Sequence, residues 1–484
     1  MPDEPVICSD LAVVGAGAAG LYAALSAASV GASVTLVSAT PLAQTASYWA
    51  QGGIAAALAV EDSFARHLAD TEAAGRNLVR RSAAEVLVCE APARVHDLEA
   101  MGVRFDADRR GVLALGLEGG HSVRRVVHAG GSATGRRVVR QLSALVVDSA
   151  NVDVLEGARA TGAWMHDGRC AGVVLEDGRA VQARATILAT GGAAALWSRT
   201  TNPPGSLGIG MSIAHAAGAQ LADLEFLQFH PTAVTGVRGR EGFLVTEAIR
   251  GEGATLHGPD GERFVEELAP RDEVSRAIAA LLERTGASSV ALDMRGVDAS
   301  LFPNVVSALG DAGLDPTRET IPVSPAAHYM MGGVVTDLHG RSTVAGLYAV
   351  GETACTGLHG ANRLASNSLS ECFVFGLRAA RAGLDEPAAT APGSPPPAAP
   401  LERPTRATQE ALWRDAGIVR RHEGLQRLAQ DRHPLARLIG ACALRREESR
   451  GAHQREDFPA VDPARDHQHT QVGPDEQPRT VRWT

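Results

Sequence analysis

The feature that most constrains the fold is a glycine-rich turn near the start of the chain. Gly15, Gly17 and Gly20 have the spacing GxGxxG, directly after an apolar run at residues 10–14 and before a helical pattern at residues 20–29. The first glycine makes the tight turn, the second lets the backbone approach a pyrophosphate, and the third allows close packing of helix on strand. The N-terminus of the following helix attracts phosphate charge. This arrangement predicts a dinucleotide-binding βαβ unit.

The segment around this turn carries no charged residue between residues 11 and 60. A membrane span needs about 20 consecutive apolar residues, whereas this segment is rich in Gly, Ser, Thr and Gln and contains Pro41. A parallel strand covered on both faces explains the missing charges better. We therefore expect a buried βαβ unit, with its second strand at residues 33–37, and no membrane span. The acidic N-terminus also lacks the basic region of a signal peptide.

The chain contains no lysine, so all 46 basic residues are arginine. This composition excludes Schiff-base chemistry on lysine and a phosphate loop that ends in Gly-Lys-Ser/Thr. The formal net charge of -9 argues against nucleic-acid binding, which depends on neutralising phosphates. Six scattered cysteines without ligand spacing indicate a reduced, cytoplasmic protein with neither disulfides nor a bound metal.

Two later apolar runs, at residues 185–192 and 346–352, indicate that the nucleotide-binding domain returns after an insertion. We expect an α/β fold in which a Rossmann-like domain is interrupted by an α+β capping domain and followed by a short helical domain. The expected boundaries are 1–223 and 330–385 for the Rossmann-like domain, 224–329 for the capping domain, 386–404 for a Pro/Ala-rich linker, 405–459 for the helical domain and 460–484 for a disordered tail.

Histidines and arginines stand out in the polar clusters of the later sequence. His230 and His328 are flanked by apolar residues, and Arg250, Arg271 and Arg363 lie in clusters with glycines and acids. A single buried histidine is more typical of a satisfied core residue. The whole set, beside a dinucleotide, indicates a site for a small dicarboxylate, because arginine binds carboxylates with two parallel hydrogen bonds.

Long motifs of the chain resemble those of the succinate dehydrogenase and fumarate reductase flavoprotein superfamily. The resemblance extends over residues 9–385, with a weaker match from 413 to 459. Its motifs are SYWAQGGIAA (47–56), EGGHS (118–122), FHPTA (229–233), APRD (269–272), PAAHYMMGGV (325–334) and TGLHGANRLASNSL (356–369).

The nearest branch of that superfamily oxidises L-aspartate to iminoaspartate, and the resemblance implies the same activity here. It implies FAD as cofactor, with electrons passed to oxygen, giving hydrogen peroxide, or to fumarate. The reaction opens bacterial NAD biosynthesis through quinolinate, with a hand-off of the product to quinolinate synthase as an implied partnership.

The resemblance also assigns the residues that contact FAD. The last two of them begin a helix whose N-terminus faces the flavin, where negative charge develops on reduction. The implied contacts are Gly15, Ala16, Gly17, Ala18, Ala19, Gly20, Ser38, Ala46, Ser47, Tyr48, Trp49, Ala50, Gln51, Gly52, Gly53, Glu352, Ser368 and Leu369.

The same resemblance assigns the substrate and catalytic residues. His230, His328 and Arg363 are the implied carboxylate ligands, together with Thr246. Arg271 matches the catalytic arginine of the superfamily, and Glu247 and Arg250 match its proton relay. With a side-chain pKa above about 12, arginine is a poor base, so we expect Arg271 to orient and stabilise charge during aspartate oxidation and to donate a proton when fumarate is reduced.

Two residues distinguish branches of the superfamily on chemical grounds. Covalent flavin attachment needs a histidine ahead of AQGG, and Ala46 occupies that place, so FAD is expected to bind noncovalently. Glu118 offers a carboxylate that pairs with the ammonium of aspartate, a group that succinate lacks.

Three departures from the superfamily pattern leave alternatives open. Ile209 stands where an acid is usual, Ala39 where a lysine is common, and the helical domain before Ala436 is short. They predict weaker FAD binding or incomplete docking of that domain. The alternatives to an aspartate-oxidising enzyme are a soluble fumarate reductase or succinate-oxidising relative, and a noncatalytic FAD-binding remnant.

Overall fold

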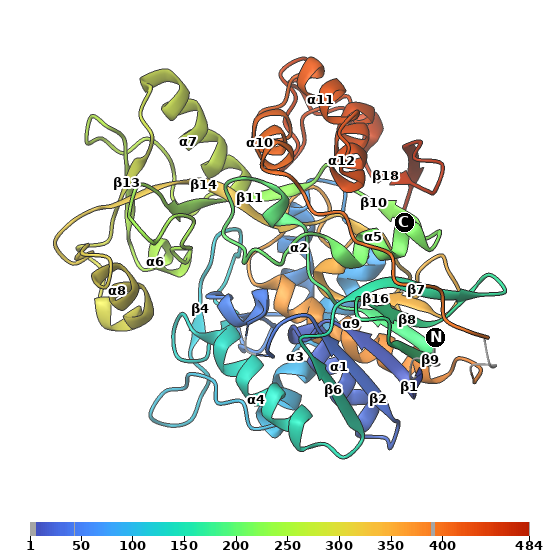
Figure 1. Cartoon of the computed structure of the whole chain (residues 1–484). Coiled ribbons are helices and arrows are strands. Elements are labelled where there is room, and N and C mark those ends of the chain that lie inside the picture. The colour runs from blue at the N-terminus through green and yellow to red at the C-terminus, as the bar shows by residue number, and fades with distance from the viewer. Residues whose placement is uncertain (1–5, 43, 389–392, 484) are drawn as a thin grey trace.

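The computed structural model describes residues 6–42, 44–388 and 393–483. Its central sheet has the strand order β6-β2-β1-β9-β8-β7, with β16 also paired to β9 (Figure 1). The strands are β1 (Val6–Val14), β2 (Val34–Ser38), β6 (Val152–Glu156), β7 (Ala160–His166), β8 (Arg169–Leu175), β9 (Ala180–Leu188) and β16 (Leu347–Ala349). The pairs β1–β2, β1–β9, β2–β6 and β9–β16 are parallel. The βαβ unit and the two later strands expected from the sequence are confirmed.

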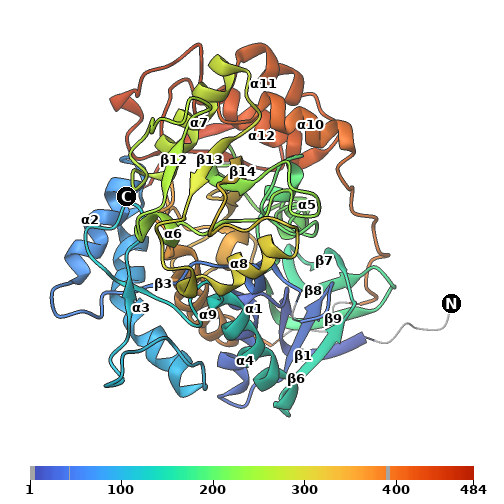
Figure 2. The same ribbon diagram turned by 90° about the vertical axis from the view of Figure 1, so that its left-hand side faces the viewer.

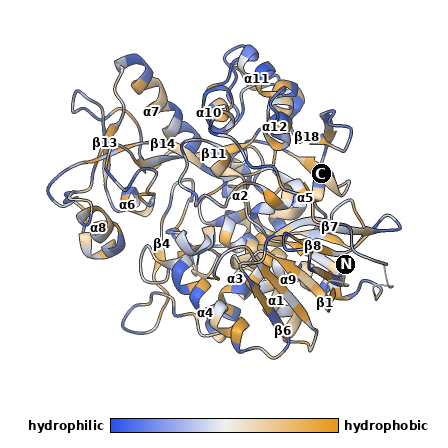
Figure 3. Ribbon diagram, in the orientation of Figure 1, coloured by the Kyte–Doolittle hydropathy of each residue, from blue (hydrophilic) through white to orange (hydrophobic). Residues whose placement is uncertain are grey.

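Helices pack on the central sheet and beside it (Figure 2). They are α1 (Ala18–Ala28), α2 (Phe64–Ala74), α3 (Arg81–Ala100), α4 (Thr134–Asp148), α5 (Ile209–Ala216) and α9 (Asn367–Leu384). A small sheet beside them contains β3 (Ile54–Ala55), β4 (Leu115–Gly116) and β5 (Val126–Val127). The strands of the central sheet are mostly apolar, whereas polar residues follow the outer side of α4 and of α11 (His422–Leu428) (Figure 3).

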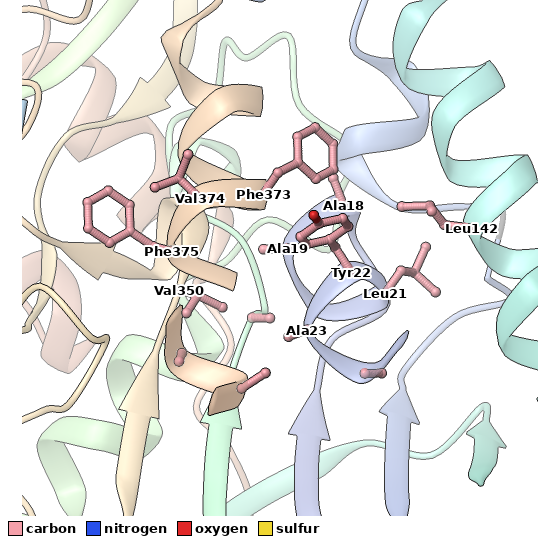
Figure 4. Packing of buried hydrophobic residues seen from close by; sticks show 14 of the residues in the cluster. Ala18, Ala19, Leu21, Tyr22, Ala23, Leu142, Val350, Phe373, Val374 and Phe375 are labelled. Carbon is pink, nitrogen blue, oxygen red and sulfur yellow. The ribbon is translucent and has the colours of Figure 1, made fainter. Parts of the chain in front are cut away.

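Packing between α1 and α9 fixes the two helix N-termini that the site uses. Tyr22 of α1 meets Phe373 of α9 edge to face, with ring centroids 5.3 Å apart (Figure 4). Ala19 and Ala23 present small side chains on the α1 side, and Gly376 lets α9 come close to the Ala19 carbonyl. Each fully buried aromatic contributes roughly 1.5–3 kcal/mol. The contact therefore holds the start of α9 in a fixed relation to the glycine turn.

The inserted segment forms a second sheet of order β11-β14-β13-β12 with its own helices. Its elements are β11 (Leu227–Val234), α6 (Ala248–Gly251), β12 (Thr255–His257), α7 (Arg271–Thr285), β13 (Val290–Asp293), α8 (Pro303–Gly310) and β14 (Ile321–Met330). Its buried core cluster uses only residues between Val234 and Val323. This separate core supports the capping domain proposed at 224–329, whose boundaries stay a prediction.

The C-terminal region differs from the sequence expectation. After α10 (Arg406–Asp415), α11 (His422–Leu428) and α12 (Pro434–Arg445), the segment predicted to be a disordered tail forms β18 (Gln468–Val472) and β19 (Arg479–Arg482). These strands join a five-stranded sheet with β10 (Leu221–Ala222), β15 (Gly333–Val335) and β17 (Ala354–Cys355). The expectation of a disordered tail at 460–484 is therefore wrong.

Buried charges explain the order of this polar segment. His469 Nδ1 contacts Asp223 Oδ2 at 2.5 Å, and the Arg446 guanidinium contacts Glu225 Oε1 at 2.6 Å. These four side chains are at most 2% exposed. Because such pairs satisfy each other only when the segments meet, they dock the C-terminal region onto residues 223–225. The expectation of incomplete docking is not met.

The predicted linker at 386–404 lies partly outside the described residues, at 389–392. Its described part from 393 to 404 contains neither helix nor strand. In the part of the chain that the structure describes, no helix is long and apolar enough to cross a membrane.

Candidate active site

The glycine turn after β1 has the close packing that the dinucleotide motif requires. Gly15 has φ +111°, and a Cβ there would overlap the Ala189 carbonyl oxygen. A Cβ at Gly20 would overlap the carbonyl of Gly15. Gly17 precedes α1 in extended conformation and places no side chain over the helix end. Only glycine fits at positions 15 and 20, and α1, whose N-cap residue Gly17 has no capping side chain, suits a pyrophosphate.

The predicted FAD stretch at 46–53 lies against this turn and reaches the start of α9. The Ser47 hydroxyl accepts a hydrogen bond from the Ala18 amide at 3.1 Å. Gly53 donates from its amide to the Ser366 hydroxyl at 3.1 Å, and Ser366 directly precedes α9 with φ +60°. Ser368 and Leu369 thus lie in the first turn of α9. Both helix N-termini assigned to FAD are joined by one continuous segment.

Glu352 belongs to the same region but has an unusual environment. Its Oε1 accepts a hydrogen bond from the Met330 amide at 2.8 Å, and a Cβ at Gly192 would overlap that carboxyl. Burial raises the pKa of Glu352 to about 8. A protonated carboxyl can donate to a hydroxyl as well as accept from one. Ile209, at the start of α5, places an apolar side chain where the superfamily offers an acid.

Several predicted FAD residues are committed elsewhere or exposed. The Ser38 hydroxyl donates to the Thr40 carbonyl at 2.6 Å, and Gln51 donates from Nε2 to the Leu244 carbonyl at 2.7 Å. Trp49 is 54% exposed and packs edge to face on Tyr48, with ring centroids 5.1 Å apart. The Ser38 and Gln51 side chains thus bind backbone carbonyls of the protein, and the Trp49 ring is largely exposed to solvent.

Two of the predicted site arginines, Arg271 and Arg363, converge on Gln228, a residue of β11. Gln228 Oε1 accepts hydrogen bonds from Arg271 at 3.1 Å and from Arg363 at 3.0 Å. Its Nε2 donates to the Arg363 carbonyl at 2.8 Å and to Asn362 Oδ1 at 2.9 Å. Gln228 therefore ties the loop before α9 to the first residue of α7.

Arg271 also takes part in a buried chain of charges. Its Nε donates to Glu247 Oε2 at 2.6 Å, and Arg250 Nη2 lies 3.4 Å from Glu247 Oε1. Burial raises the pKa of Glu247, but Arg271 and Arg250 outweigh it, so that the net shift is downward. Glu247 is thus a carboxylate held between two guanidiniums. Thr246 precedes it and is buried.

The two predicted histidines lie side by side. Their ring centroids are 5.0 Å apart, and His328 Nδ1 contacts the Thr201 hydroxyl at 2.7 Å. Burial lowers the pKa of His230 and of His328 well below the ordinary value, and the charge of Arg271 lowers both further. Both rings are therefore neutral, and a ring N–H can donate to a carboxylate oxygen.

Arg363 lies over an aromatic ring. Its guanidinium carbon is 4.6 Å from the centroid of Tyr329, whose hydroxyl donates to Glu371 at 3.0 Å. His359 contacts the same carboxylate oxygen of Glu371 at 2.8 Å. Burial lowers the pKa of Arg363 to about 10, and the charge of Arg271 acts in the same direction. Arg363 remains a cation at neutral pH.

Glu118 is brought to this centre by the loop after β4. Its Oε2 accepts a hydrogen bond from Ser366 at 2.6 Å, and its Oε1 lies 3.5 Å from His128 Nε2. Burial raises its pKa, but the interactions with His128 and Ser366 outweigh burial and set the pKa at about 2. Glu118 is therefore ionised, in contact with the residue that precedes α9.

Unpaired polar atoms collect around this centre. Among the described residues, the buried side-chain atoms without a hydrogen-bond partner include Glu118 Oε1, Glu247 Oε1, Arg250 Nε and Nη2, and Arg363 Nε. A buried polar atom without a partner costs about 1–3 kcal/mol. Their concentration at one place is the pattern expected of a site that a charged ligand completes.

Gln228, Tyr329 and Ser366 are the site residues that the sequence analysis missed. Gln228 lies two positions before His230, a spacing that returns a strand side chain to the same face. Tyr329 follows His328 directly, and Ser366 lies two residues before Ser368. All three lie next to predicted site residues in the sequence. None of them is charged, however, so their residue types alone did not indicate a role.

The fold and the glycine cradle together define a flavoprotein with FAD as cofactor. A family model described as FAD binding domain matches residues 10–369, and one described as fumarate reductase flavoprotein C-term matches residues 429–483. A quinol–fumarate reductase structure has a TM-score of 0.88 at 30% identity, over 99% of this chain and 97% of that one.

Curated relatives narrow the class further. L-aspartate oxidase of Caulobacter vibrioides is 46% identical over 93% of this chain and 94% of its own length. That of Streptomyces coelicolor is 42% identical over 93% and 89%. The chain belongs to the L-aspartate oxidase family of flavoproteins.

Proposed function

We propose that this protein oxidises L-aspartate to iminoaspartate with bound FAD and passes the electrons to oxygen, giving hydrogen peroxide, or to fumarate. The observation that carries the proposal is Glu118, a buried ionised carboxylate beside a cluster of cations, whose Oε1 accepts no hydrogen bond among the described residues and lies 3.5 Å from His128 Nε2. Succinate and fumarate offer nothing to that oxygen, whereas the ammonium of aspartate does. The L-aspartate oxidases among the relatives support the same substrate.

The substrate carboxylates would be held by Arg363, His328 and His230. A guanidinium gives two parallel hydrogen bonds to one carboxylate, and the neutral histidines donate single hydrogen bonds to the other. Bound FAD would supply the acceptor for the hydride that leaves the α-carbon and carries both electrons. The residues around it hold the substrate in one orientation and exclude water.

Arg271 orients and stabilises charge during aspartate oxidation, because a guanidinium is a poor base at neutral pH. When fumarate is reduced, it donates a proton from its guanidinium to carbon. Glu247, at 2.6 Å, and Arg250 behind it return that proton from the interior side. Thr246, which directly precedes Glu247, adds a hydroxyl to the carboxylate ligands. These roles for Arg271, Glu247 and Arg250 form the catalytic part of the proposal.

The mode of FAD attachment and the fate of the product extend this proposal. Ala46 has only a methyl group, so no side chain at that position bonds covalently to the flavin. Because an imine hydrolyses in water, we place quinolinate synthase next in the reaction sequence, taking the product directly. The six cysteines, which are free in the described chain, fit the cytoplasmic location that we propose.

Anaerobic flavin reduction tests the proposal against its two rivals. The purified FAD-loaded protein is mixed with L-aspartate or with succinate, and flavin absorbance is followed. We expect rapid bleaching with L-aspartate and little with succinate. Bleaching by succinate alone would establish a succinate-oxidising relative instead. A protein whose bound flavin is bleached by neither substrate, or that takes up no added FAD, would be the noncatalytic remnant.

A further inference from the structure

A cavity lies away from the substrate residues, where the C-terminal strand β19 meets the end of β15. It has a volume of about 420 Å³. Arg80, Arg341 and Arg482 reach it from three distant parts of the sequence, together with Thr336, Asp337 and Trp483. No residue assigned above to FAD or substrate lines it. Ligand cavities of roughly 300–1,000 Å³ accommodate small metabolites.

The charges at this cavity are unbalanced. Asp337 is the one acid among its described lining residues, and it lies 3.5 Å from Arg341. Arg80 donates to the Thr336 carbonyl at 3.3 Å, a neutral partner. Arg482 is exposed and makes no ion pair with any described residue. Among the described residues, two of the three lining arginines therefore lack an acidic partner, in a chain whose net charge is -9.

Trp483 gives the cavity a fixed apolar wall. Its ring stacks on His469 with centroids 4.2 Å apart and planes inclined by 19°, and His469 is itself held by Asp223 at 2.5 Å. The Arg80 guanidinium carbon lies 6.0 Å from the indole centroid. An aromatic wall beside free guanidiniums suits a ligand with a planar body and a strongly negative end.

We propose that this cavity binds a nucleoside monophosphate. Guanidiniums recognise phosphate with paired, charge-assisted hydrogen bonds, and Arg80 and Arg482, neither of which pairs with an acid among the described residues, supply them. The base and ribose fill the remaining volume against Trp483. The uncompensated positive charge selects phosphate esters over neutral nucleosides, because leaving two guanidiniums unpaired forfeits those hydrogen bonds.

Calorimetric titration tests this proposal on the FAD-loaded protein with succinate present, so that the nucleotide cradle and the dicarboxylate site are both filled. The probes are AMP, inorganic phosphate and adenosine. We expect AMP to bind more tightly than phosphate, and adenosine to show no measurable binding. Adenosine that binds as tightly as AMP overturns the role of the arginines, and phosphate that binds as tightly as AMP overturns the nucleoside assignment.

Variants tie the binding to this cavity. Arg482→Ala and Arg80→Ala should each weaken AMP binding about tenfold or more, the effect of a lost charge-assisted hydrogen bond. Arg479→Ala is the matched control, since Arg479 lies on the same strand, pairs with Asp475 and does not line the cavity. Unchanged FAD content and thermal unfolding show that each variant is folded. AMP affinity that is equal in Arg482→Ala and Arg479→Ala overturns the proposal.

Discussion

Arg271 and Arg363 donate hydrogen bonds to one and the same oxygen, Gln228 Oε1, at 3.1 and 3.0 Å. Two guanidiniums that share one acceptor atom are close enough to repel each other. An acceptor between them offsets this repulsion. The amide oxygen supplies that acceptor without the negative charge that would compete with a dicarboxylate substrate. Gln228 thus sets the spacing of the two arginines.

Replacing Gln228 with Leu should therefore weaken both directions of catalysis. We expect kcat/KM for L-aspartate oxidation and for fumarate reduction to fall by about tenfold to hundredfold, the cost of lost hydrogen bonds to charged groups. Gln409→Leu is the control, because Gln409 lies on α10, donates a hydrogen bond of 2.8 Å to the Ala195 carbonyl and contacts neither arginine. Kinetics equal to those of the control would contradict the role of Gln228.

Tyr329 should position Arg363 through its ring rather than its hydroxyl. Tyr329→Leu removes the aromatic face 4.6 Å from the guanidinium carbon and should raise KM for dicarboxylates by about threefold to thirtyfold. Tyr329→Phe keeps the face, loses the hydrogen bond to Glu371, and should change KM much less. Steady-state kinetics with both substrates decide the matter, and equal effects of the two variants would assign the role to the hydroxyl.

Glu118→Gln should separate the two substrates. The amide no longer pairs with the ammonium, so kcat/KM for L-aspartate should fall by about tenfold or more, whereas fumarate reduction should change little. Because the pKa of Glu118 is about 2, the wild-type carboxylate is ionised throughout the usual assay range. The aspartate-specific loss should accordingly be constant between pH 6 and 9. Equal losses with both substrates would remove Glu118 from substrate selection.

The parts of the fold with strong local signals were predictable from the sequence. The glycine turn and the strand β1 were found because close packing requires glycine and because buried parallel strands exclude charge. The strand β18 was missed, since Gln468–Val472 is polar and pairs with the two-residue strand β10, some 250 positions earlier. Its stability depends on Asp223 and Arg446, whose contacts no local pattern reveals.

The same distinction holds in the site. Residues with a charge or a ring nitrogen, such as Arg363 and His328, could be proposed from their type and motif. Gln228 and Tyr329 act on those residues through contacts between distant segments, and their own chemistry gives no sign of it. The assignment of each role stays a prediction until the variants are measured.

Glu352 should make apoprotein stability depend on pH. Its folded pKa of about 8 lies above the unfolded value, so the folded state binds an extra proton between roughly pH 4.5 and 8. Its contribution is fully present below that window and is lost as the pH rises through it, by at most about 1.4 kcal/mol per unit. In thermal unfolding experiments, the Glu352→Gln apoprotein should lose less stability between pH 5.5 and 8 than the wild-type apoprotein. Identical pH profiles would show that Glu352 has an ordinary pKa.

Arg446 should be among the most costly residues to replace in the C-terminal region. It pairs with Glu225 at 2.6 Å and with Glu448 at 2.9 Å, and all three side chains are at most 2% exposed. Arg446→Met leaves the buried Glu225 without its salt-bridge partner, while Arg450 still pairs with Glu448 at 2.9 Å, and should lower the free energy of unfolding by about 3–5 kcal/mol. Urea titration at a fixed FAD concentration measures this loss, because FAD binding itself shifts the unfolding transition.

The exposed pair of Arg479 and Asp475 provides the comparison, and Arg479→Ala should change stability by about 0.5 kcal/mol or less. Adding Glu225→Gln to Arg446→Met should restore part of the loss, since it removes one unpaired charge. A loss no larger than that of Arg479→Ala would mean that the pair does not dock the C-terminal region.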